Sequence, residues 1–320
     1  MKLLPKLVRA GLKTGSKKIL EQAYNRKQLI KMPDVSINQV YKAAVFRSKL
    51  AAFNRMHNWH STKLHPCFPQ VLGFNQQLEL LLHRSSLFPL MGLVHLGNQI
   101  VVNRLPENND LSLTFQFGKM DLHQKGIIFC VEMNAFQANQ LCISSQSDYL
   151  FRTGSQLEGS TPRSDKIQKS GLKPELTGIK NIKSTFATTQ LKANAGRKYA
   201  KVSGDYNPIH LTKWTASMFG FKRPIAHGMH TLALAVSAIQ AKRQQEFDSH
   251  IIANEFANAA FLPCNLQLQV PNDHALLDTD QFKLINENMP QHKQVVTTIQ
   301  IQAGTNHPNL RLNKTLKNSI

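Results

Sequence analysis

Acidic residues are scarce in this chain of 320 residues. It has 19 Asp and Glu residues against 39 Lys and Arg residues, which gives a formal net charge of +20. Such a balance favours anionic partners and says little about the fold. Candidate partners are nucleic acid, an acidic membrane surface, an acidic protein or a phosphate-bearing ligand. The basic residues are not interleaved with aromatic residues in a base-stacking pattern, so we expect no nucleic-acid partner.

Cysteine is also rare, and the four cysteines lie far apart without a C-x-x-C pair. This spacing disfavours a zinc site and a disulfide framework. Cys130 and Cys142 lie in the apolar, strand-like stretches "GIIFCVEM" and "NQLCIS". A free thiol in such a context usually packs as a small core residue. The cysteines therefore predict a reducing, cytoplasmic compartment.

No run of 18 or more apolar residues is present, which excludes a membrane-spanning helix on length. The segment "MKLLPKLVRAGLKTGSKKIL" alternates apolar residues with Lys and Arg and has no uncharged stretch, so it is not a secretory signal. As a helix it would carry an apolar stripe opposite a basic face, as in peripheral membrane helices and transit peptides. A solvated basic extension, or a helix packed on the body, is equally open.

The length fits two domains of about 150 residues each. Residues 1–62 are basic, with only Glu21 and Asp34 as acids, and a later stretch rich in Gly, Ser, Pro and Lys is typical of a linker. The expected division is a basic extension (1–62), a first domain (63–152), a linker (153–181), a second domain (182–306) and a basic tail (307–320).

The two expected domains share one pattern. The apolar spacing in the first predicts a helix over residues 69–85, and strand-like runs follow at 90–102, 111–120, 126–136 and 140–151. The second has a strand at 184–194, a helix at 227–245, and strands within 256–271, 280–288 and 293–304. A helix packed on an antiparallel sheet is an α+β unit. The pattern therefore predicts a tandem duplication.

The stretch "YAKVSGDYNPIHL", residues 199–211, places an acid and a histidine on one tight turn. Gly204, Asp205 and Asn207 are all turn formers, and the Asn-Pro pair excludes a helical conformation at Asn207. A turn with no further role is the alternative reading. A carboxylate at Asp205 beside the ring of His210 suits proton transfer near neutral pH.

A second segment, "GFKRPIAHGMHT" at residues 220–231, opens the apolar helix with Gly228. An amide at a helix N-terminus has no acceptor within the helix and can hold developing negative charge. Together, the turn and this amide are the parts needed to handle an enolate next to a carbonyl.

These two segments closely resemble the MaoC-like dehydratase family, the (R)-specific enoyl-CoA hydratases of the hydratase 2 type. The resemblance is detailed over roughly residues 186–240, and the rest of the chain looks like members with two hot-dog domains. It implies a double hot-dog fold, with two antiparallel sheets that each wrap a central helix. The first half has no D-x-N-P-x-H motif, so it should be catalytically silent and leave room for longer acyl chains.

The resemblance also implies site residues. Asp205 and His210 would be the catalytic pair, with Asn207 as the supporting polar residue and the Gly228 amide as the oxyanion donor. The expected substrate-binding residues are Tyr199, Lys222, Arg223, Ile225 and Ala226. For Tyr199 simple packing, and for Lys222 and Arg223 a solvated loop, are the alternatives.

The implied reaction is reversible hydration of trans-2-enoyl thioesters, or dehydration of (R)-3-hydroxyacyl thioesters, in fatty-acid metabolism. The substrate would be carried by coenzyme A or acyl carrier protein, with no cofactor. We expect a monomer whose two hot-dog units pair within the chain, or a homodimer. The competing hypothesis is a non-catalytic protein that binds acyl thioesters or a lipid surface.

Histidines outside the motif have no assigned role. His227 and His230 flank Gly228 and either tune the site or are structural. His57, His60 and His65 cluster in the sequence, but their spacing matches no metal-ligand pattern, so we expect no metal site.

Overall fold

The computed structural model describes residues 14–90, 92–153, 184–244, 246–270 and 281–303. The predicted linker, apart from Thr153, and the predicted basic tail lie outside these residues. Residues 1–13, the start of the amphipathic segment, lie outside them as well.

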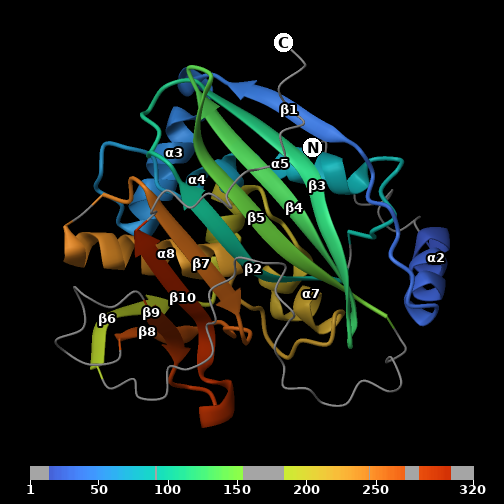
Figure 1. Ribbon diagram of the computed structural model, residues 1–320. Helices are drawn as coiled ribbons and strands as arrows, with labels where there is room; N and C mark the ends of the chain where they lie inside the picture. The colour runs from blue at the N-terminus through green and yellow to red at the C-terminus, as the bar shows by residue number, and fades with distance from the viewer. Residues whose placement is uncertain (1–13, 91, 154–183, 245, 271–280, 304–320) are drawn as a thin grey trace.

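A ten-stranded antiparallel sheet forms the body of the protein (Figure 1). The first half of the chain supplies β1 (Ser36–Tyr41), β2 (Leu93–Val102), β3 (Leu111–His123), β4 (Gly126–Gln137) and β5 (Gln140–Arg152). The second half supplies β6 (Ser184–Leu191), β7 (His250–Phe256), β8 (Cys264–Val270), β9 (Gln281–Asn286) and β10 (Val295–Ala303). The order is β1-β3-β4-β5-β2-β7-β10-β9-β8-β6. Read outward from the centre, both halves have the same connectivity, as the repeated sequence pattern predicts.

The two halves meet where β2 pairs with β7, from Gly97 opposite Glu255 to Val102 opposite His250. The two antiparallel sheets that we expected join here into one continuous sheet. The physical reason is that β2 and β7 would each be an edge strand with unpaired N–H and C=O groups, which the pairing satisfies. Gly97 permits the close approach, because a side chain there would collide with the carbonyl of Asn254.

Each half packs a central helix on the sheet. The helix predicted over 69–85 is divided into α4 (Phe68–Leu72) and α5 (Phe74–Leu82), and the second half has α8 (Gly228–Arg243). The division falls at Gly73, where a Cβ atom would collide with the ring of Phe115. In Figure 1, α8 passes behind β7 and β10, and its buried face includes Leu232, Val236 and Ile239.

The basic N-terminal stretch contributes to the packed body. Helix α2 (Thr14–Asn25) buries Leu20 and Tyr24, and the Tyr24 hydroxyl donates to the carbonyl of His123 at 2.9 Å. Strand β1 pairs with β3, and α3 (Ala43–His57) buries Phe46 and Phe53. Residues 14–57 therefore lie in the body although their composition suggested an extension, because the cations occupy exposed faces. We propose that the first domain begins before β1.

Four shorter elements lie in connections of the second half, three of them between β6 and α8 and one between β9 and β10. They are α6 (Ala195–Ser203), the 3-10 turn η1 (Pro208–His210), α7 (Lys213–Ser217) and the 3-10 turn η3 (Gln291–Lys293). All four cysteines are buried, which confirms the expectation that Cys130 and Cys142 pack in the core. Among the described residues, no helix is both long and apolar enough to cross a lipid bilayer.

Candidate active site

The turn that carries Asp205 and His210 begins at the end of α6. Gly204 ends the helix with φ +86°, a left-handed conformation that glycine adopts without strain, and its amide bonds the Ala200 carbonyl at 2.8 Å. The Asp205 Oδ1 then accepts from the Asn207 amide at 3.1 Å, and the Asn207 Oδ1 accepts from the Ile209 amide at 3.4 Å. These bonds build the turn. They occupy one carboxylate oxygen of Asp205 and leave Oδ2 for other contacts.

His210 is fixed in one orientation and one tautomer. Its Nδ1 lies 2.8 Å from the carbonyl of Ile225, and the Ile225 amide in turn donates to the Ile209 carbonyl at 3.1 Å. A carbonyl oxygen can only accept, so Nδ1 carries the hydrogen. Nε2 of the neutral ring is therefore a proton acceptor.

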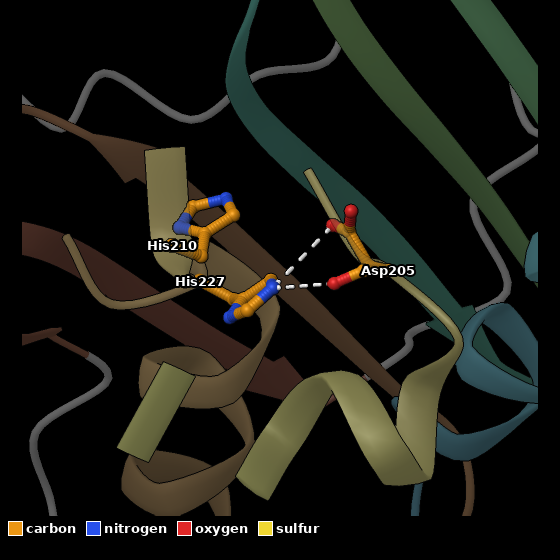
Figure 2. A group of neighbouring side chains, drawn as sticks. All are labelled: Asp205, His210 and His227. Carbon is orange, nitrogen blue, oxygen red and sulfur yellow. Dashed lines mark hydrogen bonds and ion pairs between the residues drawn. The ribbon is translucent and has the colours of Figure 1, made fainter. Parts of the chain in front are cut away.

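His227, which precedes α8, holds the other two residues of the group (Figure 2). Its ring stacks on that of His210 with centroids 3.7 Å apart and planes at 25°. Its Nε2–H donates to the backbone carbonyl of Asp205 at 3.0 Å and lies 3.8 Å from the Asp205 Oδ2. The buried Nδ1 has no hydrogen-bond partner in the described part of the chain. His227 thus links the two residues that the turn projects.

The distances between these side chains fit a bridging water molecule. One nitrogen or carboxylate oxygen from each of Asp205, His210 and His227 lies within 4.8 Å of the other two. A water molecule that makes two hydrogen bonds of about 2.8 Å separates its partners by about 4.6 Å. A metal ion fits less well, because lone pairs lie in the ring planes and two stacked rings do not aim them at one point. The predicted absence of a metal stays a prediction.

Gly228 is the first residue of α8, so its amide has no acceptor within the helix. An added Cβ would lie 2.7 Å from Cζ of Phe256, which means that the Phe256 ring packs directly on Gly228. Only glycine fits beneath this ring. The site thus combines a carboxylate, a neutral imidazole and a helix N-terminus within one short part of the second half.

Comparison with known proteins agrees with this arrangement. Residues 179–268 match the model of the family described as "MaoC like domain". This part of the chain is therefore similar to that family. The matched residues include the turn with Asp205 and His210 and the start of α8.

Two characterised proteins are similar in sequence. The 3-hydroxyacyl-thioester dehydratase X of Mycobacterium tuberculosis is 26% identical over 204 residues, which are 63% of this chain and 68% of that protein. The peroxisomal enoyl-CoA hydratase 2 of Arabidopsis thaliana is 28% identical over 174 residues, or 52% of this chain and 51% of that protein. The chain therefore aligns with only about half of the plant hydratase.

Solved structures share the fold. HtdX of Mycobacterium tuberculosis superposes with a TM-score of 0.65 at 20% identity, covering 84% of this chain and 100% of that one. A MaoC-like dehydratase of Phytophthora capsici gives 0.61 at 15% identity, covering 88% and 100%. The double hot-dog, α+β architecture expected from the sequence is thus confirmed.

The environment shifts the pKa values of Asp205, His210 and His227. Burial raises the pKa of Asp205 above 3.8, and the nearby His210 and the Asn207 amide partly oppose this. Burial lowers the pKa of His210 below 6.5, opposed by Asp205. Burial, together with His210, lowers the pKa of His227 well below 6.5. The shifts bring the acid and the base closer together in pKa, which suits proton exchange near neutral pH.

The expected substrate-binding residues fall into two groups. Tyr199 is buried and packs between the rings of His227 and His230, with centroids 4.7 and 4.9 Å away. Ile225 and Ala226 act through the backbone, since Ile225 orients His210 and the Ala226 amide donates to the Ala260 carbonyl at 2.8 Å.

The basic pair is at the surface. Lys222 and Arg223 are exposed, and the Arg223 guanidinium lies 5.8 Å from the centroid of the Phe261 ring. Their contact with a ligand stays a prediction. So does the expected room for a long acyl chain. Two surface hollows lie beside α2, and their lining includes none of the site residues.

Two residues of the first half, His57 and Lys49, contact residues of the second half near the site, which the sequence did not predict. His57 on α3 donates from Nδ1 to the Phe53 carbonyl at 2.8 Å, so its Nε2 accepts from Nδ1 of His230 at 2.9 Å. Lys49, also on α3, donates to the Ser203 carbonyl at 3.4 Å, two residues before Asp205. Burial lowers the pKa of Lys49 to about 8.

Proposed function

We propose that the protein catalyses the reversible hydration of trans-2-enoyl thioesters, or in the other direction the dehydration of 3-hydroxyacyl thioesters. The observation that carries this proposal is the spacing of Asp205 and His210 for one shared water, beside the open amide of Gly228. The two characterised relatives are named for these two directions of one reaction. The (R) configuration of the product follows from the family resemblance.

In the proposed mechanism, the water donates its two hydrogens to Nε2 of His210 and to the Asp205 carboxylate, and its oxygen lone pair attacks C3 of the enoyl group. One of the two groups takes a proton as the C3–O bond forms. The electron pair of the C2–C3 double bond moves toward the thioester carbonyl, whose oxygen the Gly228 amide stabilises. The proton taken from water is then delivered to C2, which gives net addition of H and OH on one face.

His227 acts as a positioning residue in this proposal. Its imidazole donates a hydrogen bond to the backbone carbonyl of Asp205 and stacks on the ring of His210. Because its pKa lies well below 6.5, it stays neutral at physiological pH. It therefore fixes the distance between the two catalytic groups without adding a positive charge.

The Asp205→Asn variant tests the proposal. It keeps an Oδ1 acceptor for the turn but loses the carboxylate, so we expect hydration of crotonyl-CoA to fall by about 10²–10⁴-fold. The loss of the enoyl thioester's ultraviolet absorbance measures the rate. The Asp110→Asn variant is the matched control, because Asp110 is an exposed carboxylate that caps α3 in the first half. Turnover by Asp205→Asn at the wild-type rate would contradict the assignment.

The same assay separates the enzyme from the competing hypothesis of an acyl-thioester binding protein. Tight binding of crotonyl-CoA by the wild type without any hydration would favour the binding protein. Rates on coenzyme A and acyl carrier protein thioesters of four to sixteen carbons would define the carrier and the chain length. We propose a thioester substrate and leave these two choices to that experiment.

A further inference from the structure

Four apolar side chains next to the catalytic turn are exposed to solvent. Of the eight large hydrophobic residues that are exposed in the described part of the chain, four lie between residues 206 and 219. They are Tyr206 (46% exposed), Trp214 (73%), Met218 (66%) and Phe219 (37%). Scattered exposed apolar residues are ordinary, but a group of four within one short segment marks an interaction surface.

One side of helix α7 is anchored to the rest of the protein. This anchor fixes the direction of the exposed side chains on the other side. Thr215 Oγ1 donates to the Pro208 carbonyl at 2.7 Å, and Ala216 is fully buried. Trp214 and Met218, one helical turn apart, face the opposite way from this anchor. Pro208 belongs to the same turn as His210, so the exposed group sits directly beside the candidate active site.

The segment of the chain that carries this group is basic. Residues 192–243 contain nine Lys and Arg residues and a single acidic residue, Asp205, which is used by the turn. Lys213 and Lys222, which flank Trp214, Met218 and Phe219 in the sequence, are exposed. Arg197 on α6 donates to the Leu211 carbonyl at 2.8 Å, which brings the basic helix α6 alongside. We define the α7 face as Tyr206, Lys213, Trp214, Met218, Phe219 and Lys222.

We propose that the α7 face docks on an anionic lipid bilayer. Exposed Trp, Met and Phe side chains insert among headgroups and acyl chains, and Lys side chains pair with acidic headgroups. A second copy of this chain is a poor occupant, because a two-fold contact would place cations against cations. A nucleotide or an acidic protein would account for the cations. Neither partner requires an exposed apolar group that includes a Trp side chain 73% exposed. Docking here places the candidate site at the membrane surface.

Intrinsic fluorescence tests this proposal, because the chain has two tryptophans and they differ in environment. Trp59 is 4% exposed and Trp214 is 73% exposed, so a blue shift on vesicle binding reports Trp214. We expect the shift with vesicles of phosphatidylserine and phosphatidylcholine, a much weaker one with phosphatidylcholine alone, and its loss at high salt. Vesicle co-sedimentation measures the affinity in parallel.

Variants assign the binding to the α7 face. Replacing Trp214 and Met218 together by Ser should weaken vesicle binding by at least about tenfold, and each of Lys213→Gln and Lys222→Gln by about fivefold. Val45→Ser is the matched control, since Val45 is 75% exposed on α3. The Asp205→Asn variant should bind vesicles like the wild type, so a failure of the proposed reaction leaves this test intact.

Three outcomes overturn the proposal. The first is vesicle binding with no change in Trp214 emission, or with no loss in the Trp214 and Met218 double variant. The second is a blue shift with an acidic carrier protein and none with acidic vesicles. The third is a Trp214-dependent dimer, measured by light scattering, in the absence of lipid.

Discussion

The two halves of the molecule have the same topology and different chemistry. In the second half, the central helix α8 opens with Gly228, which follows His227 of the candidate site. In the first half, α4 opens with Phe68 and Pro69, both buried, and proline has no N–H to offer. The sheet order around the two helices is nevertheless the same. The fold therefore depends on packing that both copies keep, whereas the site depends on a few residues that one copy has.

The first half is still connected to the site. The His57–His230 hydrogen bond joins residues 173 positions apart, and Lys49 contacts the end of α6. The carboxylate of Asp205 also contributes to the raised pKa of Tyr149 on β5, although burial is the larger cause. The first half, which lacks the D-x-N-P-x-H motif, thus contacts and supports a histidine and a helix end of the second half.

The largest expected difference between the halves comes from two glycines. Gly228→Ala and Gly73→Ala each place a methyl group against an aromatic ring, Phe256 or Phe115, at a helix start. Both should lower the free energy of unfolding by about 1–3 kcal/mol. Only Gly228→Ala should also lower kcat, by about 10²–10³-fold, because the oxyanion donor moves. Thermal unfolding and steady-state kinetics measure the two effects, and an equal loss of kcat in Gly73→Ala would break the comparison.

A smaller effect is expected at the contact between the halves. His57→Phe removes the acceptor for the buried Nδ1–H of His230, which should cost about 1–3 kcal/mol of unfolding free energy. His60→Phe is the matched control, since His60 is exposed three residues away. Urea denaturation gives both values. If the two variants were equally stable, the contact would contribute nothing to holding the halves together.

The pH dependence of stability should differ least between the halves, because both contain buried histidines. Burial lowers the pKa of His57 from 6.5 to about 4, so between these values the unfolded chain binds a proton that the folded chain does not. Stability is full above about pH 6.5 and falls as the pH drops, by up to about 1.4 kcal/mol per pH unit for each such histidine. Asp205, whose pKa is raised, has the opposite sign.

Urea denaturation between pH 7 and pH 4 measures this slope. His230, His65 and His227, whose pKa values are also lowered by burial, act in the same direction as His57. The wild type should lose stability on acidification, and His57→Phe should show a shallower slope. A flat profile in the wild type would mean that these histidines are not buried in their neutral forms.

The sequence predicted the parts of the fold that have local signals. Strand β3 alternates apolar and polar residues, β4 is an apolar run with β-branched residues, and α8 has apolar residues at helical spacing, so all three were predicted. Strand β7 was not, because "HIIANEF" is short and its burial arises from pairing with β2, about 150 residues away. Strand β1 was hidden in a basic stretch for the same reason, since its partner is β3.

The sequence likewise predicted the local part of the candidate site and not its long-range contacts. The turn chemistry of Gly204, Asp205 and Asn207 follows from the sequence, and the structure shows each of its hydrogen bonds. The stack of His227 on His210 does not follow, because it requires the start of α8 to pack against the turn. The catalytic roles themselves stay predictions until activity is measured.

A double-mutant cycle on Asp205 and His210 tests the central claim most directly. If both groups act on one water, removing either removes the shared step, so Asp205→Asn with His210→Gln should be hardly slower than the slower single variant. Crotonyl-CoA hydration by the wild type and the three variants gives the coupling energy. Multiplicative losses, with no coupling between the two positions, would contradict the account.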